Sequence, residues 1–377
     1  MSRTIIIGGG IVGSCTAYFL ADHAEVIVLE KDPSYQYAST TLSAASIRTQ
    51  FSLPLNVRMS LFGAEFLAAR AERVGSVRRA YLVLATAATE PVLRANREMQ
   101  LAEGAEVALF DPRQLATRFP WLNATDLACA TLGLKHEGWF DAYSLLRGVR
   151  ADAIERGARY VREEAVGFDF VAGRVAAVST ASGERISGDH FLIAAGPASG
   201  RIAALAGIPL PVEPRKRTVF VIRAPLDGAA MPLVFDTSGM WIRPEGDGFI
   251  CGISPPPEAD PHPGDDFNPD LEILEDRLWP LLAHRIPALE QLRLQRAWAG
   301  HYDQCLLDHN AVIGPVPGIA NLFVASGFSG HGVQHGPATG RGIAELIRFG
   351  CYQTMDLSLL GYQRVRDNRP LPESIVY

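Results

Sequence analysis

The first thirty residues carry short apolar runs separated by one glycine-rich turn. Residues 4–7 (TIII) form a β-branched run, and residues 24–30 (AEVIVLE) form a second one. Between them, residues 11–22 place apolar side chains at helical spacing. This pattern predicts a strand, a helix and a second strand, which together make a βαβ unit.

The middle of the chain alternates helical and extended patterns. The predicted elements are a helix over 55–75, a strand over 80–86, a helix that ends near Glu103, a helix that Asp111 caps with Pro112 in its first turn, and a helix over 141–159. Residues 160–195 then show period-two runs broken by Gly and Ser. They predict a small meander that closes with a buried strand over 191–195.

Prolines mark the second half of the chain. Two proline-rich segments, 209–225 and 255–269, predict a domain crossing and a surface loop. Between them, residues 240–254 predict a β-hairpin with its turn at Glu245 to Gly248. We find no internal repeat and no low-complexity tract.

The composition is that of a globular protein with two lobes. Of its 377 residues, 48% are hydrophobic and 20% are charged, and no segment approaches the ~20 apolar residues of a membrane span. The formal net charge of −6 lacks the basic excess that nucleic-acid binding requires. Five cysteines without a CxxC pair argue against a disulfide framework, and only three residues precede the first apolar run, which leaves no room for a signal peptide. These features predict a cytoplasmic location.

The turn GGGIVG, residues 8–13, fits the GxGxxG pattern of dinucleotide-binding proteins. Gly8 would form the tight turn, Gly10 would let a pyrophosphate approach the helix N-terminus, and Gly13 would let helix and strand pack closely. Glu30 ends the second strand, where its carboxylate would accept hydrogen bonds from a ribose. The pattern predicts NAD or FAD, and Glu30 disfavours the 2′-phosphate of NADP.

A second glycine-rich stretch, GFSGHGVQHGPATG, covers residues 327–340. Its five glycines favour a loop whose backbone lies against a flat or charged ligand. His331 and His335, four positions apart, could instead share a helix face and hold a metal. A two-histidine site lacks the third ligand of catalytic zinc, and no HExxH pattern supplies it, so we predict no metal.

Four segments together resemble the D-amino acid oxidase (DAO) superfamily of FAD-dependent oxidoreductases, which includes glycine and sarcosine oxidases. They are IIIGGGIVGSCTAYFL near the start, STTLSAASIR after the acidic strand, FLIAAGPAS in the middle and VASGFSGHGVQHGPATGRGIAEL near the end. RPEGDGFICGIS, LWPLLAHRIPALEQL and AWAGHYD look most like the FAD-dependent oxidoreductase domain branch linked to assembly of mitochondrial complex I. The resemblance implies an α/β fold, with a Rossmann-like, glutathione-reductase-like FAD-binding domain and an α+β substrate domain that contains an antiparallel sheet.

The resemblance also implies domain boundaries and cofactor contacts. The FAD-binding domain would comprise residues 1–80, 145–210 and 305–350, the substrate domain 81–144 and 211–304, and a tail over 351–377 would pack on the FAD-binding domain. The GFSGHG loop would pass beside the isoalloxazine ring, and the next helix would point its amino end at the flavin N1 and C2 carbonyl. The implied cofactor-binding residues are Gly8, Gly10, Ile11, Val12, Gly13, Glu30, Lys31, Ser39, Thr40, Ser43, Ala44, Val166, Ala195, Gly196, Gly327, Gly330, His331, Gly332, Val333 and Gln334.

We predict that the FAD is bound non-covalently. One branch of the superfamily carries an attachment histidine where this chain has Ser43. Monomeric sarcosine oxidases carry an attachment cysteine where this chain has His301, and Cys305 lies a few residues away.

Amine oxidation in this superfamily resembles hydride transfer to flavin N5, which needs a carboxylate clamp more than a strong base. The clamping arginine of glycine-oxidase-like members is replaced here by Tyr302. Arg48 is the first candidate replacement, because its fork matches two oxygens, with His301 and Tyr302 as hydrogen-bond partners. Arg243 is the second candidate, and a surface or interdomain salt bridge is the preferred interpretation of it. The predicted substrate-site residues are Arg48, Trp241, His301, Tyr302 and His331.

We therefore expect an enzyme that oxidises the C–N bond of a small amino acid or N-substituted glycine. Oxidation of a 2-hydroxy acid or glycerol phosphate stays open, as does a non-catalytic role as an assembly or electron-transfer subunit. None of Lys31, Lys135 and Lys216 stands where sarcosine-oxidase-like relatives place the lysine that speeds oxygen reduction, although an arginine or a protonated His331 could supply that charge. We expect a quinone or protein carrier, rather than oxygen, as electron acceptor. The oligomeric state is open.

Overall fold

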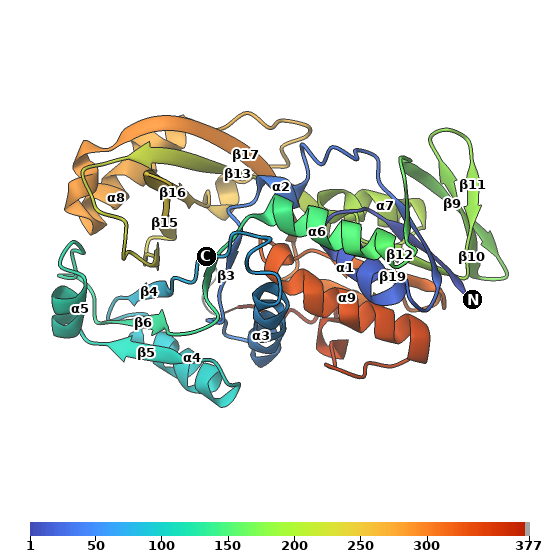
Figure 1. The fold of residues 1–377 in the computed structure, drawn as a ribbon, viewed down its shortest axis with the longest axis horizontal. Helices are drawn as coiled ribbons and strands as arrows, with labels where there is room; N and C mark the ends of the chain where they lie inside the picture. Colours follow the sequence, from blue (N-terminus) through green and yellow to red (C-terminus); the bar gives the residue numbers. More distant parts are fainter. Residues whose placement is uncertain (374–377) are drawn as a thin grey trace.

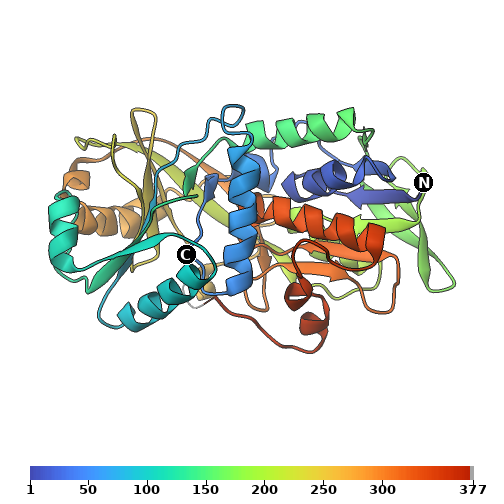
Figure 2. The ribbon, with the colours of Figure 1, turned by 60° about the horizontal axis from the view of Figure 1, so that its bottom comes forward.

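The computed structural model describes residues 1–373 and contains two large β-sheets (Figure 1). One sheet has six strands and the other has eight, and the chain passes between them several times. Helix α3 (Pro54–Ala68) stands between the two sheet regions in both views (Figure 2). Each region is therefore assembled from segments that lie far apart in the sequence.

The six-stranded sheet is buried on both faces. In sheet order its strands are β18 (Val312–Pro315), β19 (Leu322–Ser326), β12 (His190–Ile193), β1 (Arg3–Ile7), β2 (Glu25–Leu29) and β8 (Arg159–Val161), all paired in parallel except β18 with β19. Along β1, Ile6 packs into one hydrophobic cluster, whereas Ile5 and Ile7 pack into another. Burial on both faces explains the unbroken apolar runs of the sequence.

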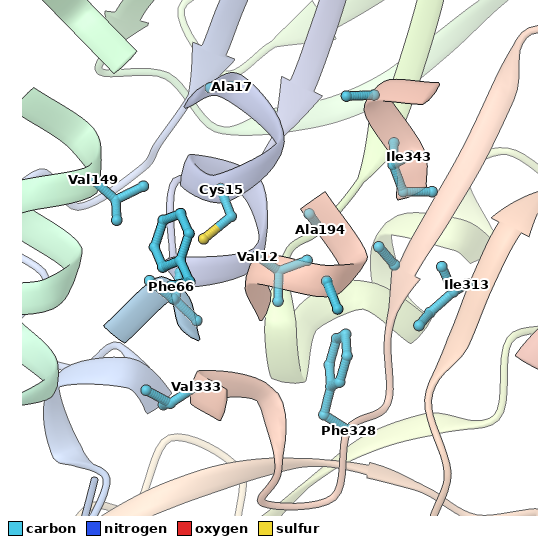
Figure 3. Packing of buried hydrophobic residues seen from close by; sticks show 14 of the residues in the cluster. Val12, Cys15, Ala17, Phe66, Val149, Ala194, Ile313, Phe328, Val333 and Ile343 are labelled. Carbon is cyan, nitrogen blue, oxygen red and sulfur yellow. The ribbon is translucent and has the colours of Figure 1, made fainter. Parts of the chain in front are cut away.

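Helices cover one face of this sheet. Helix α1 (Ile11–Leu20) packs against α6 (Ala142–Glu155) and α9 (Gly332–Phe349), and α9 packs against α3. The core between these elements contains Val12, Cys15, Phe66, Val149, Phe328 and Val333 (Figure 3). A three-stranded sheet and α7 (Ser199–Leu205) contribute to the cluster on the other face; its strands are β11 (Arg185–Ser187), β10 (Arg174–Thr180) and β9 (Ala165–Val171).

The eight-stranded sheet is almost entirely antiparallel. In sheet order its strands are β17 (Arg293–Cys305), β13 (Val212–Arg223), β16 (Gly248–Ile253), β15 (Met240–Glu245), β14 (Leu233–Phe235), β4 (Tyr81–Ala85), β6 (Cys129–Gly133) and β5 (Val107–Phe110). Only β4 and β14 pair in parallel among these neighbours. The predicted antiparallel sheet is thus present, with one parallel pair where two distant segments meet.

The remaining elements are short or lie at the edges of the two sheets. They are α2 (Ser39–Leu42), β3 (Ser46–Ile47) paired with β7 (Gly138–Trp139), α4 (Glu90–Ala102), α5 (Pro112–Arg118), α8 (Trp279–Arg285), α10 (Gln363–Arg366), a π-helical turn over Leu274–Leu278, and 3-10 turns over Gly196–Ala198, Pro257–Ala259, Pro287–Gln291 and Ser358–Leu360.

Local patterns in the sequence predicted most of these elements correctly. The βαβ unit and the 240–253 hairpin are confirmed, and Asp111 caps α5 in a capping box. The meander is confirmed for β9, β10 and β11, whereas the strand predicted to close it, β12, lies in the six-stranded sheet. The helix predicted over 55–75 is too long, because α3 ends at Ala68 and the chain continues in turns.

The proline-rich segment 209–225, predicted to mark a domain crossing, is mostly strand β13. Pro214 is tolerated there because only β17 pairs with that part of the strand, which leaves the proline on an open edge. Val212 packs into a cluster of the six-stranded sheet, whereas Phe220 packs into a cluster of the eight-stranded sheet. The strand therefore runs from one hydrophobic core to the other.

The domain boundaries inferred above stay a prediction. Leu357 and Leu360 of the C-terminal segment pack into the cluster that contains α1 and α9. Within residues 1–373, no helix combines the length and the apolar character needed to cross a bilayer.

Candidate active site

The turn between β1 and α1 requires glycine at two positions for reasons internal to the protein. Gly8 has a φ of +102°, and a Cβ there would lie 2.3 Å from the carbonyl oxygen of Ala194. A Cβ on Gly13 would lie 2.0 Å from the carbonyl oxygen of Gly8. These contacts match the predicted tight turn and the close packing of helix on strand.

Gly10 differs from both of these glycines. It has an ordinary φ of −62°, and a Cβ there would meet only Oγ1 of Thr40 at 3.7 Å. Gly10 is the N-cap of α1 and has no side chain to cap the helix; of the N–H groups at this end, that of Ile11 donates to Oγ1 of Thr40 at 3.3 Å. Free N–H groups at a helix N-terminus attract anions, so the open space and the partial positive charge fit the pyrophosphate of a dinucleotide.

Glu30 follows β2 and faces the same turn. Its Oε2 accepts a hydrogen bond from the Gly9 N–H at 2.8 Å, and its Oε1 accepts one from the Asp32 N–H at 2.9 Å. Burial raises the pKa of Glu30, while these two hydrogen bonds favour the charged form. Each carboxylate oxygen has two lone pairs, so Glu30 can brace the turn and still accept a ribose hydroxyl.

A cavity that is partly open to solvent lies where the two sheet regions meet. Its wall comes from residues 39–48, from strands β4, β13, β14, β15, β16 and β17, and from residues 329–334. Among the described residues of this wall, two are arginines and none is Asp or Glu, which favours anionic ligands. The predicted site residues that line it are Ser39, Ser43, Ala44, Arg48, Trp241, His301, Tyr302, Gly330, His331, Val333 and Gln334.

Arg48 is buried in this wall, with 4% of its surface exposed. Its Cζ lies 4.4 Å from the ring centre of Phe51 and 5.5 Å from that of Phe235. Its Nη2 lies 3.1 Å from Nε2 of His331, and its backbone N–H donates to Oε1 of Gln334 at 2.8 Å. Aromatic rings and the start of α9 thus hold the guanidinium in place, which lowers the entropy cost of binding a ligand to it.

The two histidines of the glycine-rich stretch are buried and neutral. Burial and the charge of Arg48 lower the pKa of His331 well below its usual value, and they lower the pKa of His335 to about 3. Arginine only donates, so Nε2 of His331 accepts from Arg48 and the ring proton sits on Nδ1. The expectation that protonated His331 could supply positive charge is therefore wrong, and Arg48 carries that charge.

Strand β17 holds the glycine loop, residues 327–331. Oδ2 of Asp303 accepts hydrogen bonds from two backbone N–H groups of this loop, at 2.8 and 3.1 Å. Burial raises the pKa of Asp303 to about 6. Gly330 has a φ of +100°, and a Cβ there would lie 2.6 Å from the ring of Tyr302. Gly330 is thus required by the packing of the loop on β17, before any ligand is considered.

His301 and Trp241 line the cavity, and the ring of each also packs against neighbouring residues. Nε2 of His301 lies 2.7 Å from the backbone oxygen of Asp266, and its ring stacks on Phe267 with 4.0 Å between ring centres. A Cβ on Gly252 would lie 2.9 Å from the indole of Trp241. Both rings are therefore fixed by their neighbours.

Arg243 departs from the predicted surface or interdomain salt bridge. It is buried, its ion pair is with Glu245 of the same strand, and its Nη2 donates to the carbonyl oxygen of Ala44 at 2.8 Å. Arg243 is therefore linked to residues 39–48 by a hydrogen bond to the backbone and not by a salt bridge.

Several predicted cofactor residues lie away from this cavity. Ile11 and Val12 bury their side chains in the core, so only their backbone could meet a ligand. Lys31 and Val166 have exposed side chains. The others lie in the turns after β1, β2, β12 and β19 or on α1, α2 and α9; they are Gly8, Gly10, Gly13, Glu30, Thr40, Ala195, Gly196, Gly327 and Gly332.

A family model described as DAO: FAD dependent oxidoreductase matches residues 3–346. The chain belongs to the DAO family of FAD-dependent oxidoreductases. It is 39% identical to FAD-dependent oxidoreductase domain-containing protein 1 of Xenopus laevis, over 98% of this chain and 83% of that protein. It is 26% identical to glycine oxidase of Geobacillus kaustophilus, over 91% of this chain and 92% of that protein.

Solved structures of DAO-fold flavoenzymes have the same architecture. The L-proline dehydrogenase from P. horikoshii aligns with a TM-score of 0.88 and 28% identity, over 98% of this chain and 99% of that one. Glycine oxidase from Geobacillus kaustophilus aligns with a TM-score of 0.81 and 24% identity, over 96% and 98%. The predicted family and fold class are confirmed.

FAD is the cofactor of the DAO family, as predicted. The space at Gly10, the open amino end of α1 and the position of Glu30 fit its dinucleotide part. Non-covalent binding stays a prediction. Burial raises the pKa of the Cys305 thiol, which makes it a poor nucleophile for attachment.

Three residues of the cavity wall, Tyr81, Arg217 and Phe235, were not predicted from the sequence. Tyr81 and Phe235 stack at 5.6 Å between ring centres, on the one parallel strand pair of the eight-stranded sheet. The feature of the sequence that could have indicated Arg217 is the basic stretch PRKR, which precedes an acidic loop with two adjacent aspartates. Within residues 1–373, no three of His, Cys, Asp and Glu gather closely enough to hold a metal.

Proposed function

We propose that this DAO-family protein oxidises the C–N bond of a small amino acid or N-substituted glycine. The observation that carries the proposal is the buried Arg48 guanidinium, held in the cavity wall between Phe51 and Phe235. Arginine binds a carboxylate through two parallel charge-assisted hydrogen bonds. In this family the bound FAD supplies the acceptor for the hydride that leaves the substrate carbon.

The residues of the chain would bind and orient the substrate rather than act as a strong base. Arg48 would hold the carboxylate, and the rings of Trp241 and Phe235 would form the apolar side of the cavity. Nε2 of His331 already accepts from Arg48, so this ring has no lone pair for the amine proton. We therefore expect the substrate to react as the free amine, after its proton has left to water.

The positions of the lysines favour a quinone or protein carrier as electron acceptor, although Arg48 does place a positive charge in the cavity wall. Lys216 is engaged by Asp266 and Asp270, both at 2.7 Å, and Lys135 lies 3.1 Å from Glu106 at the surface. None of the three lysines is among the described residues of the cavity wall. A cytoplasmic location stays a prediction, and the oligomeric state stays open.

The experiment that tests the function is anaerobic reduction of the flavin in the purified holoprotein. The panel contains D- and L-amino acids, N-methyl amino acids, 2-hydroxy acids and glycerol 3-phosphate. We expect amino or N-methyl amino acids to bleach the flavin absorbance, and slow reoxidation when oxygen is then mixed in. Bleaching by hydroxy acids alone would replace this function with the alternative oxidation. Bleaching by no member of the panel would support the non-catalytic role.

A further inference from the structure

The acidic loop, residues 255–270, is pinned to β13 by two adjacent basic residues. Nζ of Lys216 lies 2.7 Å from carboxylate oxygens of both Asp266 and Asp270. Nη1 and Nη2 of Arg217 donate to the two oxygens of Asp260, at 2.8 and 2.7 Å. Of these two cations, Arg217 also lines the substrate cavity.

Arg217 lies beside Tyr302 in the cavity wall. Its Cζ is 5.3 Å from the centre of the Tyr302 ring. Arg48 lines the same cavity as Arg217 and Tyr302, and the described residues of its wall include no other arginine and no lysine. A substrate whose first carboxylate is bound by Arg48 would therefore extend toward a second cation.

Asp260 already occupies the fork of that second cation. The Arg217 and Asp260 side chains are only 12% and 14% exposed, so water competes little for the pair. Nη1 of Arg217 also donates to the backbone oxygen of Lys216 at 2.8 Å. Three of the five N–H groups of Arg217 are thus used, and two are left: one on Nη2, and that of Nε, which is buried without a hydrogen-bond partner among residues 1–373. A second carboxylate could reach only this remaining edge, beside the negative charge of Asp260.

We propose that the Arg217–Asp260 pair is a specificity determinant that rejects substrates with a second carboxylate. Such a substrate would place its second carboxylate beside Asp260, which already shares Arg217, so the two like charges would repel each other in a largely buried place. Specificity of this kind arises from an unfavourable contact with the wrong ligand rather than from a better contact with the right one. This inference rests on the proposed function, since it concerns the same cavity.

The test uses equilibrium binding, so that it does not depend on turnover. Titration calorimetry of the holoprotein with propionate and succinate compares ligands with one and two carboxylates. We expect propionate to bind more tightly to the unmodified protein. Asp260→Asn keeps the shape of the side chain and removes its charge, so it should improve succinate binding relative to propionate by at least about tenfold. Glu258→Gln, at an exposed acid of the same loop, should leave the ratio unchanged.

Two results would overturn the inference. The first is that the unmodified protein binds succinate at least as tightly as propionate, a comparison that needs no variant to fold. The second is an unchanged ratio in folded Asp260→Asn protein. Adding Arg217→Met to Asp260→Asn should abolish the gain, and a persistent gain would also contradict the role of Arg217. If neither propionate nor succinate binds, the cavity holds no carboxylate site. If a carboxylate binds but no amino acid reduces the flavin, the proposed function alone has failed.

Discussion

Nε2 of His331 lies 3.1 Å from Nη2 of Arg48, although 283 positions separate the two residues in the sequence. This contact joins the start of α9 to residues 39–48, and both segments line the cavity. It leaves His331 neutral and concentrates the positive charge on Arg48. The site is therefore better suited to holding an anion than to removing a proton.

Replacing Arg48 by lysine should impair substrate binding more than flavin binding. Lysine keeps the charge but loses the planar fork and the contacts with Phe51 and Phe235. We expect kcat/KM for the best amino acid of the panel to fall by about 100-fold, mostly through KM. Arg223→Met, at an exposed arginine paired with Asp247, is the control and should change neither value. Unchanged kinetics in Arg48→Lys would exclude Arg48 as the clamp.

Gly10→Val should abolish FAD binding while the fold survives. Gly10 has an ordinary φ, and the protein leaves space for a Cβ there, so the added side chain would fill the space proposed for the pyrophosphate. The purified variant should be colourless, take up no added FAD, and retain the circular dichroism of the unmodified apoprotein. Gly13→Val is the contrasting variant and should fail to fold, because its side chain would meet the backbone of Gly8. A yellow Gly10→Val protein would show that the pyrophosphate does not bind at Gly10.

His335 should make the protein less stable as the pH falls. Its pKa is about 3 in the folded state and near 6.5 when unfolded, so the unfolded chain binds the extra proton. The stability that depends on neutral His335 is present above pH 6.5 and is lost below it. Between pH 7 and pH 5 the loss should be roughly 2 kcal/mol relative to His335→Gln. Equilibrium urea unfolding of both proteins at several pH values measures this difference, and parallel curves would show that His335 does not titrate in this way.

Asp303 should have the opposite dependence on pH. Burial raises its pKa to about 6, above the unfolded value of 3.8, so the folded state binds the proton more tightly. The corresponding stability is present at low pH and is lost as the pH rises from about 4 to 6. Relative to Asp303→Asn, the unmodified protein should lose roughly 2 kcal/mol between pH 4 and pH 7. The same unfolding measurements apply. If the stability of the unmodified protein relative to Asp303→Asn increased as the pH rises, the assignment would be contradicted.

Local sequence patterns predicted the proposed dinucleotide-binding residues better than the residues of the proposed substrate cavity. The positions of Gly8, Gly13 and Glu30 depend on one strand, one turn and one helix, and a short stretch of sequence determines such a unit. Arg217 could not be placed in this way. Whether its side chain meets the cavity or solvent depends on which strands flank β13 and where the acidic loop folds back.

The sequence by itself determined that this protein has a βαβ dinucleotide-binding unit and the motifs of a DAO-family flavoprotein, and the antiparallel second sheet was implied by the resemblance to that family. Local periodicity, glycine conformation and helix capping act over a few residues, so they can be recognised in the chain alone. Only the tertiary structure decided that Arg243 is buried, that His331 is neutral beside Arg48, and that Asp260 occupies the fork of Arg217. Burial and charge pairing are set by neighbours brought from distant segments, because the field at a side chain depends on everything packed around it.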